Sequence, residues 1–597
     1  MTKRSSVLRS VLISFRGLFA SRQRSTKAHE TARANGFRFV YFVDRLHLHS
    51  GRHYSILLVL AIGLGSLTFT PGQDQQRART VEPTGSTASP QPGPPGVQPA
   101  RNGPARSVPR TAAELKSRIE EIARQPALEH GFFAVKIVSL DTGQVVYEQS
   151  ANKFFRPASN MKLYTVAAAL DRLTPDYHFM TSVYAKEKPE DGKIKGDLIV
   201  YGRGDPSFAA RFNQGDYFKG MNDLADRIVA AGVKRIKGDL VGDESWFNGA
   251  PLGSGWAWED LQWSYGAEVS ALTVNDNAID LVIKPGDKVG APVTITSGPP
   301  ATFMTIANRA ITGARGSKSD LQIYRGVGAN TLEISGSLPL GDKDFMGGAA
   351  IPNPALAFVT MLRDALVKRG VRIDGRIRTL DARSLTSVVP NVSSAVPPAT
   401  NVPAQSPLVE IASMQSPPFS LIAAHTLKPS QNLYTEIILR TLGKLNTISP
   451  SQTNEEAGLI VVRNFLRQAG ASESDLALND GSGLSRNDMI TANATVQLLT
   501  FMSKHRYFAQ FRDALPIAGV DGTLRSRMKG TAAEGNVRAK TGSLSSVASL
   551  SGYVTTAGGE HLVFSMMLNN FPDAGAVRRD SIDAIAVLLA SFSGKTQ

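Results

Sequence analysis

The 597-residue chain contains no cysteine, which removes several kinds of chemistry at once. Disulfides, Cys-ligated zinc, a thiol nucleophile and the lipidated cysteine of a bacterial lipoprotein are all excluded. The nine histidines form no His-Glu-x-x-His pattern, and His47, His49 and His53 lie in a basic leader, so we expect no metal and no cofactor. Any nucleophile must come from another residue type.

Several sequence signatures of enzymes are also missing. The chain has no Gly-x-Ser-x-Gly elbow, no Walker loop and no Gly-x-Gly-x-x-Gly after a strand. These absences argue against an α/β-hydrolase and against the common nucleotide-binding folds. What remains is serine chemistry with a base other than histidine.

The net charge of +15 is concentrated near the N-terminus. Residues 1–53 contain eleven Lys or Arg and only two acidic residues, so the rest of the chain is mildly basic. No Lys/Arg run is interleaved with aromatic residues there. We therefore predict no binding to nucleic acid.

An uncharged segment, SILLVLAIGLGSLTFT at residues 55–70, follows the basic leader. It is shorter than a typical membrane span of about 20 residues but has the flanking charges of one. We expect residues 1–54 to be cytoplasmic or removed, and residues 55–70 to be a signal or a membrane anchor. The remainder would be periplasmic or otherwise extracytoplasmic, either secreted or anchored to the inner membrane.

Composition divides the rest of the chain. Residues 71–110 are rich in Pro, Gly, Ser and Gln and predict a disordered tether. Residues 181–404 are built from short β-like runs and end in a Pro/Ser-rich linker, whereas residues 111–180 and 405–597 contain both helix and strand patterns. The simplest fold class is α+β, with one catalytic domain (111–180 plus 405–597) split by a β-rich inserted domain or pair of domains.

Ser-x-x-Lys occurs twice, at Ser159/Lys162 and at Ser526/Lys529. The spacing alone is weak evidence, because two common residues match it by chance. Penicillin-binding proteins and class A β-lactamases combine it with Ser-x-Asn and then Lys-Thr-Gly, in that order along the chain. Lys540-Thr541-Gly542 is the only Lys-Thr-Gly here. No Ser-x-Asn lies between Ser526 and Lys540, so order along the chain favours Ser159 over Ser526.

Three Ser-x-Asn matches compete for the second motif. Ser150 precedes the nucleophile and fails on order, while Ser485 in DGSGLSRND remains a rival. We prefer Ser430 with Asn432, because KPSQN directly precedes a helix with an apolar face and would form a short loop beside the cleft.

Each residue type suits a step of acyl transfer. On a helix, Ser159 and Lys162 share a face, so the amine lies near the hydroxyl. Lys162 can act as a general base if burial and a cationic neighbour, such as Lys540, lower its pKa. Ser430 would relay a proton to the leaving amine, and Asn432 would hold Lys162.

The third motif would bind the substrate. Lys540 and Thr541 can hold a substrate carboxylate, and Gly542 permits close approach of a substrate backbone. The backbone N–H groups of Ser159 and Ser543 would form the oxyanion hole.

These motifs resemble class C low-molecular-mass penicillin-binding proteins, the D-Ala-D-Ala carboxypeptidase/endopeptidase family. The resemblance rests on PASNMKLYT, KPSQNLYTE, DGSGLSRND, GVDGTL and VRAKTGSL, together with GRGDPSF and IKGDLVGDESWF in the insert, and spans about residues 112–595. Gln431 departs from the family, many members of which have Asp there. The resemblance implies a serine β-lactamase/transpeptidase-like domain, an antiparallel sheet flanked by helices plus a helical subdomain.

The resemblance implies a serine DD-peptidase acting on peptidoglycan stem peptides through an acyl-enzyme on Ser159. It would remove terminal D-Ala, could cut D-Ala to diaminopimelate crosslinks, and would be acylated by β-lactam antibiotics. Arg486 and Ser545 are further candidate substrate contacts. Two alternatives stay open: a serine β-lactamase, and a non-catalytic wall-binding or β-lactam-sensing protein. The sequence leaves five properties open: the balance of the two peptidase activities, the third stem residue, the cleavage of residues 55–70, the translation start and the oligomeric state.

Overall fold

The structure is a computed structural model, and it describes part of the chain. The described ranges are 40–44, 56–60, 108–301, 303–382, 408–446, 449, 451–571 and 575–596. Most of the expected leader, signal or anchor, tether and Pro/Ser-rich linker lies outside these ranges. Contact clustering separates the chain into Met1–Arg77 and Ala78–Gln597. In the first unit, β1 (Val40–Asp44) and β2 (Ile56–Leu60) form an antiparallel pair. No helix within the described ranges is long and apolar enough to span a membrane.

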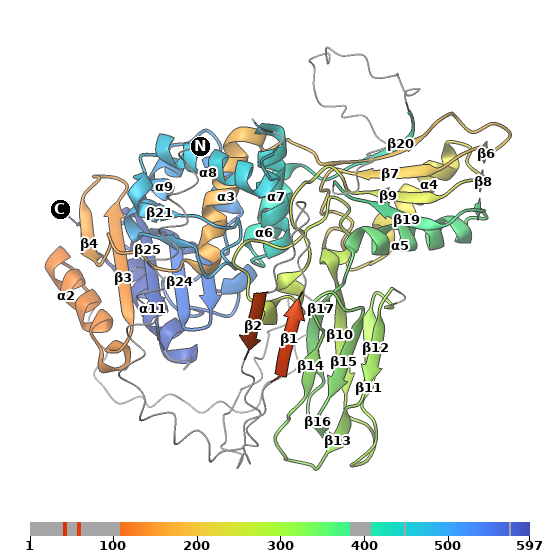
Figure 1. The fold of residues 1–597 in the computed structure, drawn as a ribbon. Coiled ribbons are helices and arrows are strands. Elements are labelled where there is room, and N and C mark those ends of the chain that lie inside the picture. Colours follow the sequence, from red (N-terminus) through yellow and green to blue (C-terminus); the bar gives the residue numbers. More distant parts are fainter. Residues whose placement is uncertain are drawn as a thin grey trace. The chain divides into compact units, whose positions relative to one another are not determined.

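A five-stranded antiparallel sheet forms the base of the catalytic domain (Figure 1). Its order is β23-β24-β25-β3-β4, so strands from the two ends of the unit lie side by side. The strands are β3 (Phe132–Ser139), β4 (Val145–Gln149), β23 (Arg538–Leu544), β24 (Val547–Thr555) and β25 (His561–Asn569). The pairing of β3 with β25 brings sequence from both sides of the insert into one sheet.

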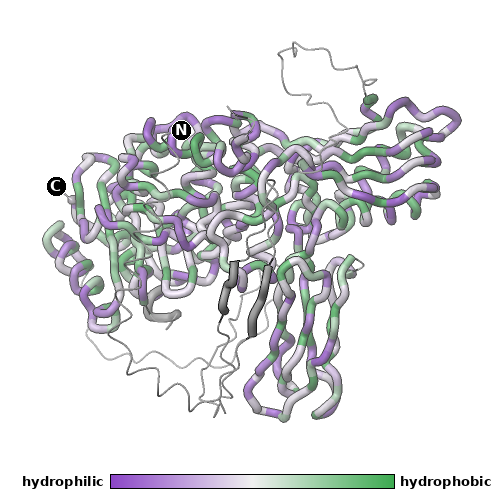
Figure 2. Tube along the Cα trace, in the orientation of Figure 1, coloured by the Kyte–Doolittle hydropathy of each residue, from purple (hydrophilic) through white to green (hydrophobic). Residues whose placement is uncertain are grey.

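Two amphipathic helices, α2 (Ala112–Ala123) and α11 (Gly575–Ser591), pack together against the sheet. Leu115 and Ile119 of α2 are fully buried, as their spacing predicts. Hydrophilic and hydrophobic residues accordingly mix along α2 in Figure 2. A capping box at Thr111 and Glu114 begins the helix by satisfying backbone N–H groups.

The helical side of the domain is centred on α3 (Met161–Leu173), whose residues 161–170 are all buried. The helix that follows Ser159 is therefore a core helix. Around it lie further helices and a small β pair: α6 (Phe419–Leu427), α7 (Asn432–Asn446), α8 (Asn454–Gln468), α9 (Ala492–Ser503), α10 (Phe508–Asp513), β21 (Leu476–Ala477) and β22 (Met489–Ile490). Since α3 is enclosed, its first turn is held rigidly.

The first part of the inserted region is a mixed five-stranded sheet with two helices packed on it. In sheet order the strands are β19 (Ile377–Leu380), β9 (Leu240–Asp243), β7 (Leu198–Gly202), β5 (Met180–Ala185) and β20 (Val409–Gln415), and the helices are α4 (Lys219–Ala230) and α5 (Pro354–Lys368). The sequence analysis expected mainly β structure and missed these two helices. The entering strand β5 pairs with the leaving strand β20, so the insert begins and ends at one place.

The second part of the insert is wholly β. It contains three small sheets, formed by β10 (Ala278–Lys284), β11 (Thr294–Gly298) and β17 (Phe345–Ala350); by β12 (Thr305–Asn308), β14 (Gln322–Tyr324) and β15 (Thr331–Ser335); and by β13 (Ile311–Gly313) and β16 (Ser337–Pro339). Buried Ile279, Leu281 and Ile283 alternate along β10 with more exposed residues, the pattern of a strand with one core face.

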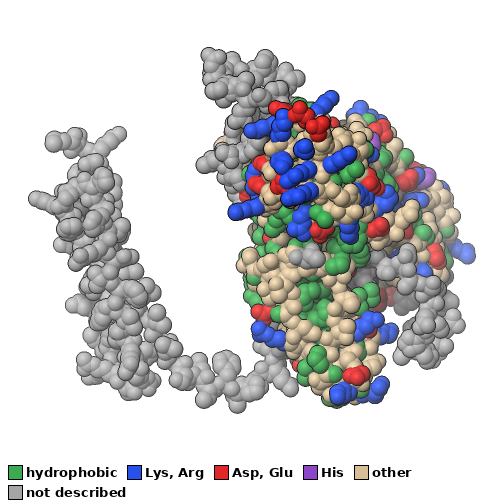
Figure 3. Space-filling model, turned by 90° about the vertical axis from the view of Figure 1, so that its right-hand side faces the viewer, with side chains coloured by type: hydrophobic (Ala, Val, Ile, Leu, Met, Phe, Trp, Pro, Cys, Tyr) green, Lys and Arg blue, Asp and Glu red, His purple; other side chains and the backbone are tan. Residues whose placement is uncertain are grey.

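Charge is distributed unevenly over the outer side of the insert. Figure 3 shows Lys and Arg side chains gathered at its upper end, mixed with acidic groups. Three short parallel strands contribute a row of cations there: β6 (Lys193–Ile194), β8 (Arg235–Ile236) and β18 (Arg372–Ile373). Asp374 lies within 2.9 Å of both Arg235 and Arg372, so the row is partly neutralised.

Candidate active site

Ser159 lies in a tight turn, η4 (Ala158–Asn160), directly before α3. Ala158 has φ +48°, a left-handed conformation that costs energy for a residue with a side chain. Strand β24 holds this turn from both ends: Ser549 Oγ donates to the Pro157 carbonyl at 2.7 Å, and Asn160 Nδ2 donates to Ser551 Oγ at 2.7 Å. The nucleophile candidate is therefore fixed between the sheet and the core helix, with its side chain partly exposed.

Lys162 follows one turn later, and its amine meets the Ser159 hydroxyl. Lys162 Nζ donates to Ser159 Oγ at 2.9 Å, to Asn432 Oδ1 at 2.6 Å and to the Ser482 carbonyl at 2.7 Å. Its side chain is fully buried. Three acceptors around one buried amine leave it little freedom to move away from the hydroxyl.

Burial lowers the pKa of Lys162 to about 7, because an ammonium ion loses its hydration there. The carboxylates of Asp480, Glu436 and Asp488 act in the opposite direction. The sequence analysis named burial and a cationic neighbour as the two causes; burial is the largest cause in the structure, and Lys540 is not among the charges that shift this pKa. Above about pH 7 the amine is mostly neutral and can accept the proton of Ser159.

Ser430 and Asn432 occupy the short loop that joins α6 to α7. Ser430 has φ +64°, and its backbone N–H donates to the Leu427 carbonyl at 3.3 Å. Asn432 is the first residue of α7 and points its amide oxygen at Lys162. Gln431 is the departure from the family pattern. Its Oε1 accepts the Leu433 N–H at 2.8 Å and so satisfies a backbone donor in the first turn of α7.

Lys540 and Thr541 lie on the edge strand β23, beside the other two motifs. Lys540 Nζ donates to Ser430 Oγ at 2.9 Å and to the Thr541 carbonyl at 2.8 Å. Burial, followed by the charge of Lys162, lowers the pKa of Lys540 well below its ordinary value. A bound carboxylate would favour its charged form again.

Gly542 meets a requirement inside the protein. A Cβ at this position would lie 2.2 Å from Ser549 Oγ and 2.6 Å from the Pro157 carbonyl oxygen. The glycine therefore lets β23 approach the turn that carries Ser159, a contact that the sequence analysis did not foresee.

The remaining predicted residues lie at the edges of this arrangement. Ser543 and Ser545 are exposed near the end of β23. Arg486 donates from Nη1 to Asp260 Oδ2 of the insert at 2.7 Å. Of the rival motifs, Ser526 and Lys529 lie on an exposed turn, and Ser485 is buried in a loop where its backbone N–H donates to Asp480.

Sequence reasoning missed the function of the loop at residues 479–488. Asp480 is fully buried and accepts hydrogen bonds from the N–H groups of Gly483 at 2.6 Å and Ser485 at 2.8 Å. This folds the loop so that the Ser482 carbonyl faces Lys162. An Asp followed by Gly and Ser is the usual sequence signal of such a turn, and it was available in DGSG.

A second missed group connects the other two motifs. Thr523, in the 3-10 turn Gly522–Leu524, has its Oγ1 2.7 Å from Thr541 Oγ1. Its backbone N–H donates to the Lys428 carbonyl at 3.0 Å, and Lys428 Nζ forms an ion pair with Asp521 at 2.5 Å. The GVDGTL segment thus joins the KPSQN loop to the Lys-Thr-Gly strand.

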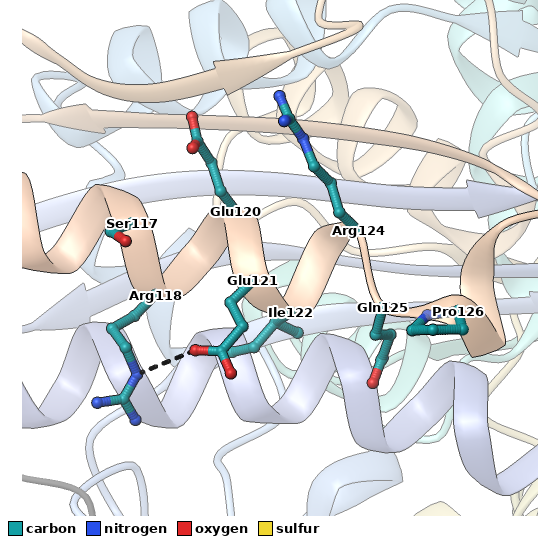
Figure 4. A pocket seen from close by; sticks show the side chains of 8 residues that line it. All are labelled: Ser117, Arg118, Glu120, Glu121, Ile122, Arg124, Gln125 and Pro126. Carbon is teal, nitrogen blue, oxygen red and sulfur yellow. Dashed lines mark ion pairs between the residues drawn. The ribbon is translucent and has the colours of Figure 1, made fainter.

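Neither a cluster of metal ligands nor the pocket in Figure 4 indicates a second functional site in the described part of the chain. No group of three or more His, Asp or Glu residues there could hold a metal ion. The pocket in Figure 4 lies along α2 and the turn after it, and contains none of the predicted site residues. It is lined by Ser117, Arg118, Glu120, Glu121, Ile122, Arg124, Gln125 and Pro126.

Comparison with known proteins identifies the same family as the motifs. The chain matches the D-Ala-D-Ala carboxypeptidase 3 (S13) family over residues 115–397 and 392–592. A D-alanyl-D-alanine carboxypeptidase from an Actinomadura species is 34% identical over 494 residues, covering 81% of this chain and 85% of the relative. The carboxypeptidase DacB of Haemophilus influenzae is 26% identical over 450 residues, covering 74% and 85%.

Solved structures show the same fold. Crystalline penicillin binding protein 4 (dacB) from Haemophilus influenzae superposes with a TM-score of 0.65 at 24% identity, covering 79% of this chain and 97% of that one. A second structure of that protein, complexed with a novel β-lactam, gives a TM-score of 0.61 at 22% identity over 79% of this chain and 97% of that one. On these matches, the chain belongs to the D-Ala-D-Ala carboxypeptidase 3 (S13) family and is a serine-type enzyme of that family.

Proposed function

We propose that the chain is a serine DD-peptidase of the cell wall that works through an acyl-enzyme on Ser159. The observation that carries this proposal is the fully buried Lys162 amine, 2.9 Å from Ser159 Oγ and 2.6 Å from Asn432 Oδ1. A hydroxyl beside a neutral, immobilised amine is an activated nucleophile.

In the acylation step, Ser159 Oγ attacks the carbonyl carbon of the penultimate D-Ala while its proton passes to Lys162 Nζ. The backbone N–H groups of Ser159 and Ser543 stabilise the oxyanion. The carbon–nitrogen bond breaks, and the leaving amine takes a proton through Ser430. Water then hydrolyses the ester and regenerates the Ser159 hydroxyl.

Substrate binding follows from the third motif. Lys540 and Thr541 take the carboxylate of the terminal D-Ala, with Thr523 orienting the Thr541 hydroxyl. Asn432 holds both Lys162 and the acyl amide, and Arg486 and Ser545 lie farther out as additional contacts. Stem peptides of peptidoglycan would be the substrates in an extracytoplasmic compartment, and D-Ala to diaminopimelate crosslinks a second target. β-Lactams would acylate the same serine.

Two assays on the purified chain test this function. With fluorescent penicillin we expect persistent covalent labelling, and with a peptide ending in D-Ala-D-Ala we expect release of D-Ala. Rapid turnover of the penicillin without peptide cleavage would instead identify a β-lactamase, and the absence of both reactions would identify a non-catalytic protein.

Digestion of purified crosslinked muropeptides tests the endopeptidase activity separately. Monomeric products would support it. If only terminal D-Ala is released, the enzyme is a carboxypeptidase alone.

A further inference from the structure

The two groups that hold Lys162 beside Ser159 are themselves held from outside the catalytic domain. These groups are Asn432 Oδ1 and the Ser482 carbonyl. Each is connected by hydrogen bonds to the same stretch of the inserted region, residues 253–266, which we call the support segment. Neither connection involves a residue of the three sequence motifs other than Asn432.

The first connection runs through an indole and a buried carboxylate. Trp256 Nε1 donates to Asp480 Oδ2 at 2.8 Å. The same carboxylate accepts the Gly483 N–H at 2.6 Å and Ser482 Oγ at 3.1 Å, which fixes the turn that presents the Ser482 carbonyl to Lys162. A hydrogen bond to a buried charged group is stronger than a neutral one. Trp256 therefore helps to determine where the Ser482 carbonyl lies.

The second connection orients an amide. Asn432 Nδ2 donates to the backbone carbonyl of Tyr265 at 2.8 Å. Because a carbonyl only accepts, the NH₂ side of the amide must face Tyr265, and the oxygen must face the amine of Lys162. The support segment thus fixes the amide rotamer that Lys162 requires.

Close packing shows that the support segment is fitted to this loop. A Cβ on Gly253 would lie 2.4 Å from Trp256 Nε1, and a Cβ on Gly255 would lie 2.4 Å from Ser485 Oγ. Asp260, which is almost fully buried, forms an ion pair with Arg486 at 2.7 Å. Gly253 makes room for the Trp256 ring within the segment, while the close approach at Gly255 and the ion pair place the segment against residues 485–487.

We propose that the support segment is part of the catalytic centre, and that Trp256 is a positioning residue that acts on Lys162 through Asp480. The inserted region would then contribute directly to acylation by holding the general base. This inference rests on the proposed role of Lys162 as the base.

The pH dependence of the acylation rate reports on the contact between Asp480 and Lys162, because the charges around Lys162 shift its pKa. Asp480 and Asp488 of the loop and Glu436 of α7 all raise the pKa of Lys162, whereas Lys540 of β23 is another buried amine, whose own pKa is lowered well below its ordinary value. Removing the charge of Asp480 should therefore lower the pKa of Lys162 and move the acid limb of the rate profile to lower pH. A general loss of stability would not move that limb.

The test measures the rate of Ser159 labelling by fluorescent penicillin from pH 5 to 10 in the full chain, together with kcat and KM for a D-Ala-D-Ala peptide. In Trp256→Phe, which removes only the N–H donor and part of the ring, we expect labelling and kcat to fall about tenfold with little change in KM. The matched control is Tyr324→Phe in β14 of the insert, outside the support segment, which also removes one polar hydrogen from an aromatic side chain and where that side chain is 51% exposed. It should label at the wild-type rate.

A double-mutant cycle tests the route through Asp480. If Trp256 acts through this carboxylate, adding Trp256→Phe to Asp480→Asn should lower the rate by less than about twofold. Asp480→Asn alone should shift the acid limb of the rate profile to lower pH. If thermal unfolding shows that Trp256→Phe does not fold, this shift is the measurement that tests the proposal.

Contrary outcomes separate the two proposals. Wild-type labelling by Trp256→Phe, full additivity in the cycle, or an unmoved acid limb in Asp480→Asn would each overturn the positioning role while leaving the proposed function intact. Labelling that persists in Ser159→Ala would instead overturn the proposed function itself.

Discussion

The chain contains Ser-x-x-Lys in two regions, and their surroundings differ in almost every respect. Around Ser159, the serine lies between a sheet and a core helix, and Lys162 is fully buried among three hydrogen-bond acceptors. Around Ser526, the serine and Lys529 are both exposed on a turn. The comparison teaches that the motif is only a spacing, and that burial of the lysine beside the serine distinguishes the Ser159 pair, which we propose as nucleophile and base, from the Ser526 pair.

The largest expected difference is between alanine variants of the two serines. Ser159→Ala should abolish penicillin labelling and lower D-Ala release on the order of 10⁴-fold or more, because it removes the hydroxyl that contacts the buried Lys162 amine. Ser526→Ala should label normally. Gel fluorescence and a D-Ala assay measure both, and loss of labelling in Ser526→Ala with retention in Ser159→Ala would reverse the assignment.

The next effect distinguishes the two lysines. Lys162→Met keeps the length of the side chain but removes the base, so the acylation rate should fall about 10²- to 10⁴-fold. Lys529→Met should leave it unchanged. Stopped-flow acylation measures both variants, and equal rates in wild type and Lys162→Met would rule out the lysine as the base.

The pH dependence sharpens the same comparison. The pKa of Lys162 is lowered to about 7, so the amine is neutral and active above that pH and protonated below it. The acylation rate should therefore decline as the pH falls through about 7, and Lys529→Met should show the same profile. A wild-type rate that stays constant from pH 8 to 5 would contradict this assignment.

A smaller effect is expected from alanine substitutions at two glycines that both have positive φ, Gly483 near Ser159 and Gly530 near Ser526. Gly483 has φ +78°, and a Cβ there would lie 1.9 Å from the Ala158 carbonyl oxygen; Gly530 has φ +70° with nothing within 4 Å. Gly530→Ala should cost about 1 kcal/mol of backbone strain alone. Gly483→Ala should cost about 3 kcal/mol or more and slow acylation, because the turn at Ser159 must move.

Urea unfolding and labelling at a temperature where both glycine variants are folded measure this difference. The two variants should differ in labelling rate as well as in stability. Equal losses of stability and unaltered labelling in both would show that the 483 contact is not needed at the site.

Patterning along the chain predicted the α+β class, motif order favoured Ser159 over Ser526, and the family resemblance implied the transpeptidase-like domain. Order along the chain selected Ser159, Lys162, Lys540 and Thr541, whereas Ser430 and Asn432 were preferred over Ser485 because KPSQN precedes a helix. Hydrogen bonds join Ser159, Lys162 and Asn432, and join Ser430, Lys540 and the Thr541 carbonyl. The spacing of the buried Leu115 and Ile119 fits α2, because a helix buries residues that recur every three or four positions. The helices α4 and α5 were missed, because short β-like runs dominate the pattern around them.

What only the tertiary structure decided is the environment of those residues. The sequence by itself determined which groups are available, since spacing and order are properties of the chain. It could not show that burial lowers the pKa of Lys162, that Gly542 packs against Pro157, or that Trp256 reaches Asp480, 224 residues away. Burial and long-range hydrogen bonds exist only after distant segments pack together, because they depend on what surrounds an atom in space.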